Sequence, residues 1–375
     1  MNYKKATFYY SSGTGNTFHT SEWMADKAAD SGLESHVIPI EEAHAKQGIE
    51  PSPDRLVGIL TPTHGFTAPW HVIKCVIGLP WGRGTHAFVS ATRAGSKLGP
   101  LFFPGIAGSS CFLLGFLLWL RGYNVRGTAS FDMPSNWISL HPGFRDKTAH
   151  AIGGRSRPMT EQFITRILAG KRVWATINNL YEVLWAVLLS WISLMYLLVG
   201  RFILAKAFFV NTSRCNSCGI CADNCPVGAI RMIGRDKPKP YWRHNCQSCM
   251  RCMSYCPTKA IEASQQLIAF FSYICFLPFS FFVSRWVAGF IPGFRASAIP
   301  YLPLAIDLAC IYAAIFLSYF LFYALSRVPW LNTVLVFTTG THYYRRYYYP
   351  ETKLSELSGR DAIVAGDDPD SKTES

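Results

Sequence analysis

Eight of the twelve cysteines fall in two runs with the same spacing, C-x-x-C-x-x-C-x-x-x-C-P. The runs consist of Cys215, Cys218, Cys221 and Cys225, and of Cys246, Cys249, Cys252 and Cys256. Three closely spaced thiolates can curl around one iron–sulfur cube, and the proline ends the turn that directs the fourth cysteine elsewhere. This spacing therefore predicts two [4Fe-4S] clusters.

The fourth cysteine of each run is expected to ligate the cluster of the other run. One cluster then takes Cys215, Cys218, Cys221 and Cys256, and the second takes Cys246, Cys249, Cys252 and Cys225. The alternative is a pair of structural zinc sites, which need four ligands and usually place them in two pairs separated by a spacer. Four cysteines with a trailing proline in each run favour the clusters.

The use of cysteine also bears on the compartment. Thiolates and clusters persist in reducing surroundings, whereas secreted chains convert cysteines to disulfides, so the cluster region is expected to face the cytoplasm. The other cysteines lie among apolar neighbours and are interpreted as small hydrophobic residues without a functional role: Cys75, Cys111, Cys275 and Cys310.

The start of the chain carries a second motif. A strand-like run over residues 6–10 is followed by Ser12, Gly13, Thr14, Gly15, Asn16 and Thr17, and then by a helical stretch. A glycine and hydroxyl loop between a strand and a helix directs backbone amides at a phosphate. The loop lacks the lysine of a Walker A motif and the G-x-G-x-x-G spacing of dinucleotide folds. An ordinary turn is the alternative.

This loop matches the [ST]-x-T-G-x-T phosphate loop of flavodoxins, and the first 140 residues resemble that family. Further strands are expected at 36–40, 56–60, 87–90 and 124–129, alternating with helices as in a doubly wound parallel α/β sheet. The resemblance implies a bound FMN at the carboxyl ends of the strands. By position, two more loops would surround its ring, and they contain Thr61, Pro62, Thr63, His64, Gly65, Thr92 and Gly95.

Three side chains near these loops have two interpretations each. His64 either tunes the flavin or is an ordinary loop residue. Trp70 either stacks on the flavin or begins the following helix. Arg93 either places a positive charge near the flavin or is a solvated surface residue, and the surface reading is favoured.

A flavodoxin-like region over residues 1–145 and a small α+β two-cluster ferredoxin region over 208–263 together resemble the flavodoxin–ferredoxin fusion proteins of anaerobic prokaryotes. The segment Met133–Trp137 also resembles that family. The resemblance implies an electron-transfer protein that couples one-electron carriers to a two-electron partner. The chain departs from soluble members of that family in its apolar stretches.

Half of the residues are hydrophobic and only 16% are charged, a balance that suggests membrane contact. The net charge of +13 comes from basic residues beside apolar stretches rather than from one basic stripe, which favours membrane flanks over nucleic acid. The first apolar stretch, 101–120, is expected to cover the sheet, because a crossing there would separate the last strand from the others.

Residues 146–207 are expected to form a linker. Its apolar stretch 184–199 has basic flanks on both sides, which favours a helix in the membrane interface or a re-entrant one over a true span. The stretches 267–290 and 301–325 are expected to form a transmembrane hairpin within a segment from 264 to 327. The turn of this hairpin contains Pro292, Gly293 and Pro300.

Two polar residues within the hairpin, Arg285 and Asp307, are expected to form an ion pair, with a proton or quinone site as the alternative. After the hairpin, residues 328–375 are expected to hold an aromatic membrane belt at Tyr343–Tyr349 and a disordered tail from Glu351 onward.

The expected function is electron relay between two clusters and FMN at the cytoplasmic face of the inner membrane. Expected partners are membrane lipid and redox proteins, either a ferredoxin-type donor or a membrane reductase, and no nucleic acid. Whether the chain is itself an enzyme stays open. The alternatives are a flavin-dependent reductase with its own small substrate and a membrane redox sensor or assembly factor.

Overall fold

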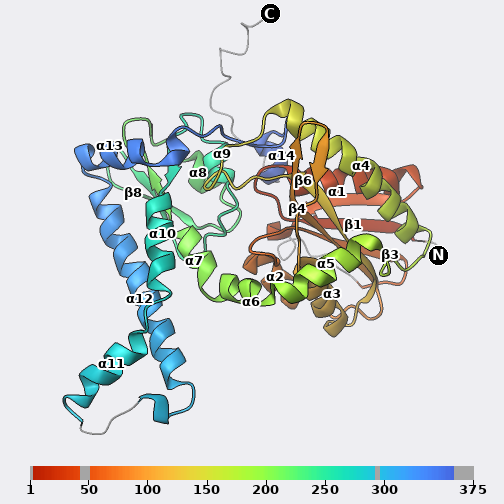
Figure 1. Ribbon diagram of the computed structural model, residues 1–375. Helices are drawn as coiled ribbons and strands as arrows, with labels where there is room; N and C mark the ends of the chain where they lie inside the picture. Colours follow the sequence, from red (N-terminus) through yellow and green to blue (C-terminus); the bar gives the residue numbers. More distant parts are fainter. Residues whose placement is uncertain (1–2, 43–50, 292–295, 359–375) are drawn as a thin grey trace, which may run out of the picture.

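Five parallel strands form the sheet of the N-terminal domain, in the order β2-β1-β3-β4-β6 (Figure 1). The computed structural model describes residues 3–42, 51–291 and 296–358. The strands are β1 (Lys5–Tyr10), β2 (Glu34–Pro39), β3 (Arg55–Pro62), β4 (His86–Leu98) and β6 (Asn124–Pro134), and a short β5 (Leu101–Phe103) pairs antiparallel with the end of β4. This order is that of a flavodoxin-like doubly wound sheet. All five predicted strands are present.

Helices cover both faces of the sheet. On one face α1 (Asn16–Asp30) and α4 (Asp146–Leu168) pack over Phe8 and Phe88, and on the other α2 (Trp70–Gly78) and α3 (Ser110–Leu120) pack over Ile59 and Val89. The prediction that the stretch 101–120 covers the sheet is therefore confirmed for α3. The α/β domain extends past the expected boundary at residue 145, because α4 packs on the sheet and not in a linker.

The apolar stretch after α4 lies along the α/β domain (Figure 1). It consists of α5 (Ile177–Leu188), α6 (Ser190–Met195), a π-helical turn (Tyr196–Gly200) and α7 (Arg201–Ala205). Asn178 and Asn179 donate to the carbonyls of Ser130 and Thr128 in β6, at 2.9 and 3.0 Å. The opposite face of α5 is apolar and exposed, and Ile177 at its start is 89% exposed. The polar contacts to β6 hold α5 on the surface of this domain.

The cysteine-rich region forms a small domain beside the α/β domain. Its elements are two short antiparallel sheets and two one-turn helices: β7 (Phe208–Val210) with β10 (Ile261–Ala263), β8 (Ile230–Ile233) with β9 (Lys239–Trp242), α8 (Ile220–Asp223) and α9 (Arg251–Ser254). The Phe208 and Trp242 rings stack in its core, with their centroids 5.6 Å apart. So few elements can bury only a small core, and much of the interior surrounds the cysteines.

A helical hairpin follows. It contains α10 (Gln265–Ile274), α11 (Phe279–Ala288) and α12 (Leu302–Leu325). The next helix is α13 (Pro329–Thr338). Short 3-10 turns occur at Ile40–Glu42, Ala296–Ala298 and Gly340–His342. By length and composition, α12 alone could cross a membrane among the described helices. Two bent helix pairs would be further candidate spans if each pair crossed the membrane as one span: α5 with α6–α7, and α10 with α11. Pro292 and Gly293 of the predicted turn lie outside the described residues.

One face of α12 packs on the cysteine-rich domain instead of facing outward. Ile311, Ile315 and Tyr319 recur every four residues on this face and are buried against residues that include Phe271 of α10 and Ile203 of α7. The Tyr319 hydroxyl donates to the carbonyl of Phe208 at 3.3 Å. The C-terminal half of α12 is thus part of the cysteine-rich domain, while its start and α11 project away from it (Figure 1).

The predicted Arg285–Asp307 ion pair is wrong. The Asp307 carboxylate of α12 accepts from the backbone N–H of Ser280 at 2.6 Å and from its hydroxyl at 3.0 Å. Ser280 is the second residue of α11, so Asp307 caps the N-terminus of that helix, where unpaired amides and the helix dipole favour an anion.

Residues 343–358 are here called the C-terminal strap. Two tyrosines of the predicted membrane belt are buried in it, whereas Tyr343 and Tyr348 are exposed, and the first residues of the predicted disordered tail, up to 358, are ordered. Tyr347 is 2% exposed and Tyr349 is 8% exposed. The Tyr347 hydroxyl donates to Asn16 Oδ1 at 2.7 Å, and the Tyr349 N–H donates to the Thr14 carbonyl at 2.7 Å. The strap ends in α14 (Leu354–Ser358). It therefore connects the α/β domain to the cysteine-rich domain, and residues 359–375 lie outside the described part.

Replacing Leu357 with alanine is expected to loosen the strap. This side chain is 0% exposed and packs in the cluster that contains Phe18 and Met24. The substitution should lower the free energy of unfolding by about 2–5 kcal/mol, the usual cost of truncating a buried leucine. Urea unfolding of the full-length protein in detergent measures this change. Leu180→Ala in the exposed face of α5 is the matched control, and an equal effect of both substitutions would contradict the burial of Leu357.

Candidate functional site

The loop between β1 and α1 has the features of an anion site. Gly15 caps α1 in a left-handed conformation with φ of 95°, without a side-chain hydrogen bond to the helix, and the first turn contains no acidic residue. The Ser12 hydroxyl accepts from the Gly15 N–H at 3.1 Å and shapes the loop. The helix therefore presents its N-terminal amides and the positive end of its dipole to the space beside the loop.

A cavity of about 240 Å³ opens beside this loop. Eight of the predicted binding residues line it: Ser12, Gly13, Asn16, Thr17, Pro62, Thr63, Gly65 and Thr92. The structure thus brings together all three predicted loops. Five predicted residues do not line the cavity: Thr14, Gly15, Thr61, His64 and Gly95. Thr14 and Gly15 instead shape the loop and contact the strap, through the Tyr349 N–H and the Thr352 side chain.

The other end of the cavity is mainly apolar. It is formed by residues that the loop assignments did not include, among them Phe66, Ile106, Met133 and Trp137. Only the segment Met133–Trp137 carried a signal in the sequence, as part of the family resemblance. A polar end beside helix amides and an apolar, aromatic end suit a ligand with one anionic and one flat aromatic end. FMN fits this description: Ser12–Thr17 would hold its phosphate, and Phe66, Met133 and Trp137 would line its ring.

His64 lies behind the cavity wall. Its ring is buried, contacts Trp137 with the ring centroids 5.8 Å apart, and faces the Tyr196 hydroxyl at 3.4 Å. Burial lowers the pKa of His64 to about 3, so the ring is neutral. Trp70 begins α2, as one of its two interpretations expected, and lines a different cavity.

Arg93 is buried, so its interpretation as a solvated surface residue is wrong. Its guanidinium pairs with Asp132 at 2.9 Å and with Glu182 of α5 at 2.5 Å, and it also lines the cavity. Glu182 in turn accepts from the backbone N–H groups of Ala107 and Gly108, at 2.9 and 2.7 Å. Burial opposes the charge of Arg93, but the two carboxylates outweigh it and raise the pKa. This ion-pair network fixes α5 to the cavity wall.

The two cysteine runs adopt the same backbone conformation. Left-handed residues recur at equivalent positions of the runs, at Ser217 and Ser248, Gly219 and Met250, and Gly228 and Lys259. The Ala229 N–H lies 3.2 Å from Cys225 Sγ, and the Ala260 N–H lies 3.3 Å from Cys256 Sγ. The duplicated motif is therefore a duplicated structure, and each fourth sulfur accepts a backbone hydrogen bond.

Cysteines of the two runs lie close enough to affect one another's charge, and their division into two crossed ligand groups stays a prediction. Burial, together with the neighbouring thiolates of Cys256, Cys215 and Cys218, raises the pKa of Cys221 to about 12. Burial also raises the pKa of Cys246, with further contributions from Cys225 and Cys249. Thiolates that are desolvated and repel one another are stabilised by a cationic metal centre, so each group fits an iron–sulfur cluster.

A single metal ion would need a tighter arrangement, as the zinc alternative requires. Across residues 3–42, 51–291 and 296–358, no three His, Cys, Asp or Glu side chains converge on one such point.

The phosphate loop and the second cysteine run are in direct contact. A β-carbon placed on Gly13 would lie 1.8 Å from the carbonyl oxygen of Cys249. From the same run, Arg251 donates through Nη2 to the Ser12 carbonyl at 2.7 Å. Arg251 is buried and also donates to the Asn224 carbonyl of the first run at 3.2 Å. Gly13 therefore lies between the flavin-type cavity, which it lines, and Cys249 of the second cysteine run.

Comparison with known proteins adds one family. Residues 208–231 match the 4Fe-4S binding domain. This match contains the whole first cysteine run, so the chain contains an iron–sulfur domain with an electron-transfer role. No curated protein matches the chain significantly.

Solved structures similar to this chain include rubredoxin oxygen:oxidoreductase from Desulfovibrio gigas, with 19% identity over 45% of this chain and 37% of that protein, and a TM-score of 0.30. Flavodoxin 1 from Bacillus cereus has 16% identity over 44% of this chain and 97% of its own, with a TM-score of 0.30. A flavodoxin from Pseudomonas aeruginosa has 14% identity over 43% and 97%, with a TM-score of 0.28. The chain thus spans 37% of the first of these proteins.

Proposed function

We propose that this chain relays electrons between two [4Fe-4S] clusters and one FMN, and that the second cluster is the one that exchanges electrons with the flavin. The observation that supports this most directly is the contact of Gly13 with Cys249. FMN holds one or two electrons, so it couples one-electron carriers to a two-electron partner. The protein contributes placement, thiolate ligation and burial.

The same contact bears on the arrangement at a membrane. Because Gly13 touches Cys249, the flavin-type cavity and the clusters lie on one side of any bilayer that the chain meets. We propose that this is the cytoplasmic side of the inner membrane, where clusters are assembled and kept reduced.

Attachment to the membrane is supported by exposed apolar side chains that a soluble monomer rarely presents together. They lie on α3, α5, α6 and α11: Phe116, Trp119, Ile177, Leu180, Val187, Trp191, Phe281, Phe282 and Trp286. We propose that α5 and α6 lie in the interface and that α11 and the start of α12 insert. A membrane reductase or a ferredoxin-type donor would then meet the relay at the bilayer.

Cofactor analysis of anaerobically prepared full-length protein tests the relay. We expect about eight irons and a matching amount of sulfide per chain from the two cysteine runs. We also expect about one FMN from the single phosphate loop. Cys249→Ser should lower the iron content while FMN stays bound, and Cys75→Ser, a buried cysteine outside the runs, is the control. Zinc in place of iron, or no bound flavin, would contradict the proposal.

A further inference from the structure

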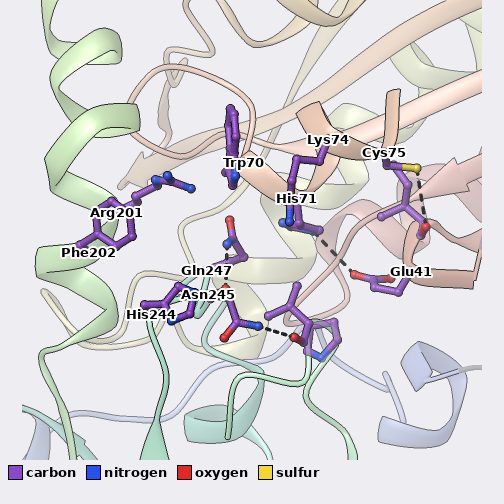
Figure 2. Close-up of a pocket in the computed structure, with 13 residues that line it drawn as sticks. Glu41, Trp70, His71, Lys74, Cys75, Arg201, Phe202, His244, Asn245 and Gln247 are labelled. Atoms are coloured by element: carbon purple, nitrogen blue, oxygen red, sulfur yellow. Dashed lines mark hydrogen bonds and ion pairs between the residues drawn. The ribbon is translucent and has the colours of Figure 1, made fainter. Parts of the chain in front are cut away.

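A second cavity, of about 510 Å³, lies between the α/β domain, α7 and the second cysteine run. Trp70 and His71 of α2 face it from one side, Arg201 and Phe202 of α7 from another, and Asn245 and Gln247 from a third (Figure 2). Asn245 and Gln247 flank Cys246, a predicted cluster ligand. The cavity therefore borders the second cysteine run at the residues on either side of Cys246.

Hydrogen-bonding atoms without a partner surround this cavity. Among the described residues, the donor Arg201 Nε and the acceptors Asn245 Oδ1 and Gln247 Oε1 are buried and make no hydrogen bond. The two amide groups are oriented by their own donations, from Asn245 Nδ2 to the Val227 carbonyl at 2.7 Å and from Gln247 Nε2 to the Asn245 carbonyl at 2.8 Å. The Asn245 oxygen is therefore unpaired, and the Gln247 oxygen lies beside the His71 ring. Unpaired buried polar groups are costly, so a ligand that pairs with them gains affinity.

His71 adds a second donor. Its Nε2 lies 2.7 Å from the Ser11 hydroxyl, while Nδ1 is buried without a hydrogen bond in the described part of the chain. Burial lowers the pKa of His71 to about 4, and the nearby Gln247 amide partly offsets this effect. The ring is thus neutral, and when Ser11 donates to Nε2, the proton is on Nδ1. The cavity therefore offers donors from α2 and α7, acceptors from the cysteine run, and the Glu41 carboxylate, whose Oε1 lies 3.7 Å from His71 Nε2.

Another cavity adjoins this one beside α12. This cavity of about 570 Å³ shares Arg201, Phe202 and His244 with the first, is also lined by Lys206, Tyr241 and Arg243, and reaches Tyr312 and Phe316 of α12. The Phe202 ring contacts the rings of Tyr312 and Phe316, with centroids 5.6 and 5.9 Å apart. A ligand with a polar, flat head at Trp70 and an apolar tail along α12 would fill both.

From this geometry we infer that the paired cavities bind a lipid-soluble quinone, with its ring beside Trp70 and its tail along α12. A quinone carbonyl accepts from Arg201 or His71, and a quinol hydroxyl donates to Asn245 or Gln247, so both redox states find partners. Conversion of quinone to quinol takes up two electrons and two protons. The electrons come one at a time from the iron–sulfur clusters of this chain, a step that rests on the proposed function, and the protons come from water.

Calorimetric titration of anaerobic, oxidised full-length protein in detergent tests this inference without turnover. The ligands are menadione, which has no tail, and a naphthoquinone with a decyl chain. Trp70→Ala should raise the Kd of both ligands at least tenfold, which corresponds to about 1.4 kcal/mol. Arg201→Met is a second variant with the same expectation. Trp174→Ala, in a cavity bordered by Phe116 and Trp119, is the matched control.

Phe316→Ser separates the tail from the head. This substitution should raise the Kd of the decyl naphthoquinone about tenfold and leave the Kd of menadione unchanged. Unchanged binding of menadione to both Trp70→Ala and Arg201→Met, or its displacement by NADH, would overturn the inference. Iron, FMN and flavin–cluster electron exchange are measured on the same samples. If those stay normal while no quinone binds, only the quinone site is rejected.

Discussion

Replacing Gly13 with alanine is expected to slow electron exchange between the flavin and the clusters several-fold, because electron transfer weakens as the two cofactors move apart. The new β-carbon would lie 1.8 Å from the Cys249 carbonyl oxygen, and real β-carbon contacts are essentially never below 3.0 Å. The obstacle is backbone, which cannot rotate away. The two domains must therefore separate by more than 1 Å, or the phosphate loop must deform.

Gly154→Ala is the matched control for this substitution. A β-carbon on Gly154 meets nothing within 4 Å, so its exchange rate should equal that of the parent protein. FMN and iron contents distinguish domain separation from loss of a cofactor. A Gly13→Ala protein with full cofactor content and an unchanged rate would contradict the proposed contact between the two cofactor sites.

Replacing Glu182 with alanine is expected to lower the free energy of unfolding by about 3–5 kcal/mol, because removing one partner of a buried ion pair leaves the other charge uncompensated. Glu182 is 1% exposed and satisfies Arg93 together with the backbone N–H groups of Ala107 and Gly108. Its loss should also release α5 from the α/β domain and weaken FMN binding, since Arg93 lines the cavity. Urea unfolding and flavin titration measure the two effects.

Glu161→Ala provides the control for Glu182. Glu161 forms an exposed pair with Arg157 four residues earlier in α4, at 2.8 Å, and such pairs contribute about 0.3–0.5 kcal/mol. An effect of Glu182→Ala as small as that of Glu161→Ala would show that Glu182 does not hold α5 in place.

The parallel sheet and the iron–sulfur domain could be predicted from the sequence because each depends on local patterns. Strand runs such as 56–60 are apolar and follow one another at the spacing of a doubly wound fold, and the cysteine spacing is a ligand pattern in itself. The sequence did not indicate that the α/β domain extends beyond residue 145. The segment of α4 is polar over much of its length, which is typical of a linker.

The interactions that the sequence did not reveal are those between distant segments. Tyr347 and Tyr349 read as a membrane belt because a run of tyrosine and arginine is typical of one, yet their partners Asn16 and Thr14 lie more than 300 positions earlier. Likewise, no sequence feature near Arg93 indicates that its side chain pairs with Glu182. Such pairings are decided by tertiary packing, which overrides local composition.

Electron exchange within single molecules of the fully loaded protein tests the central claim most directly. In anaerobic rapid mixing with a limiting one-electron reductant, electrons should redistribute between the clusters and FMN at a rate independent of protein concentration. A rate proportional to protein concentration, or clusters and flavin that titrate without exchanging electrons, would contradict the account.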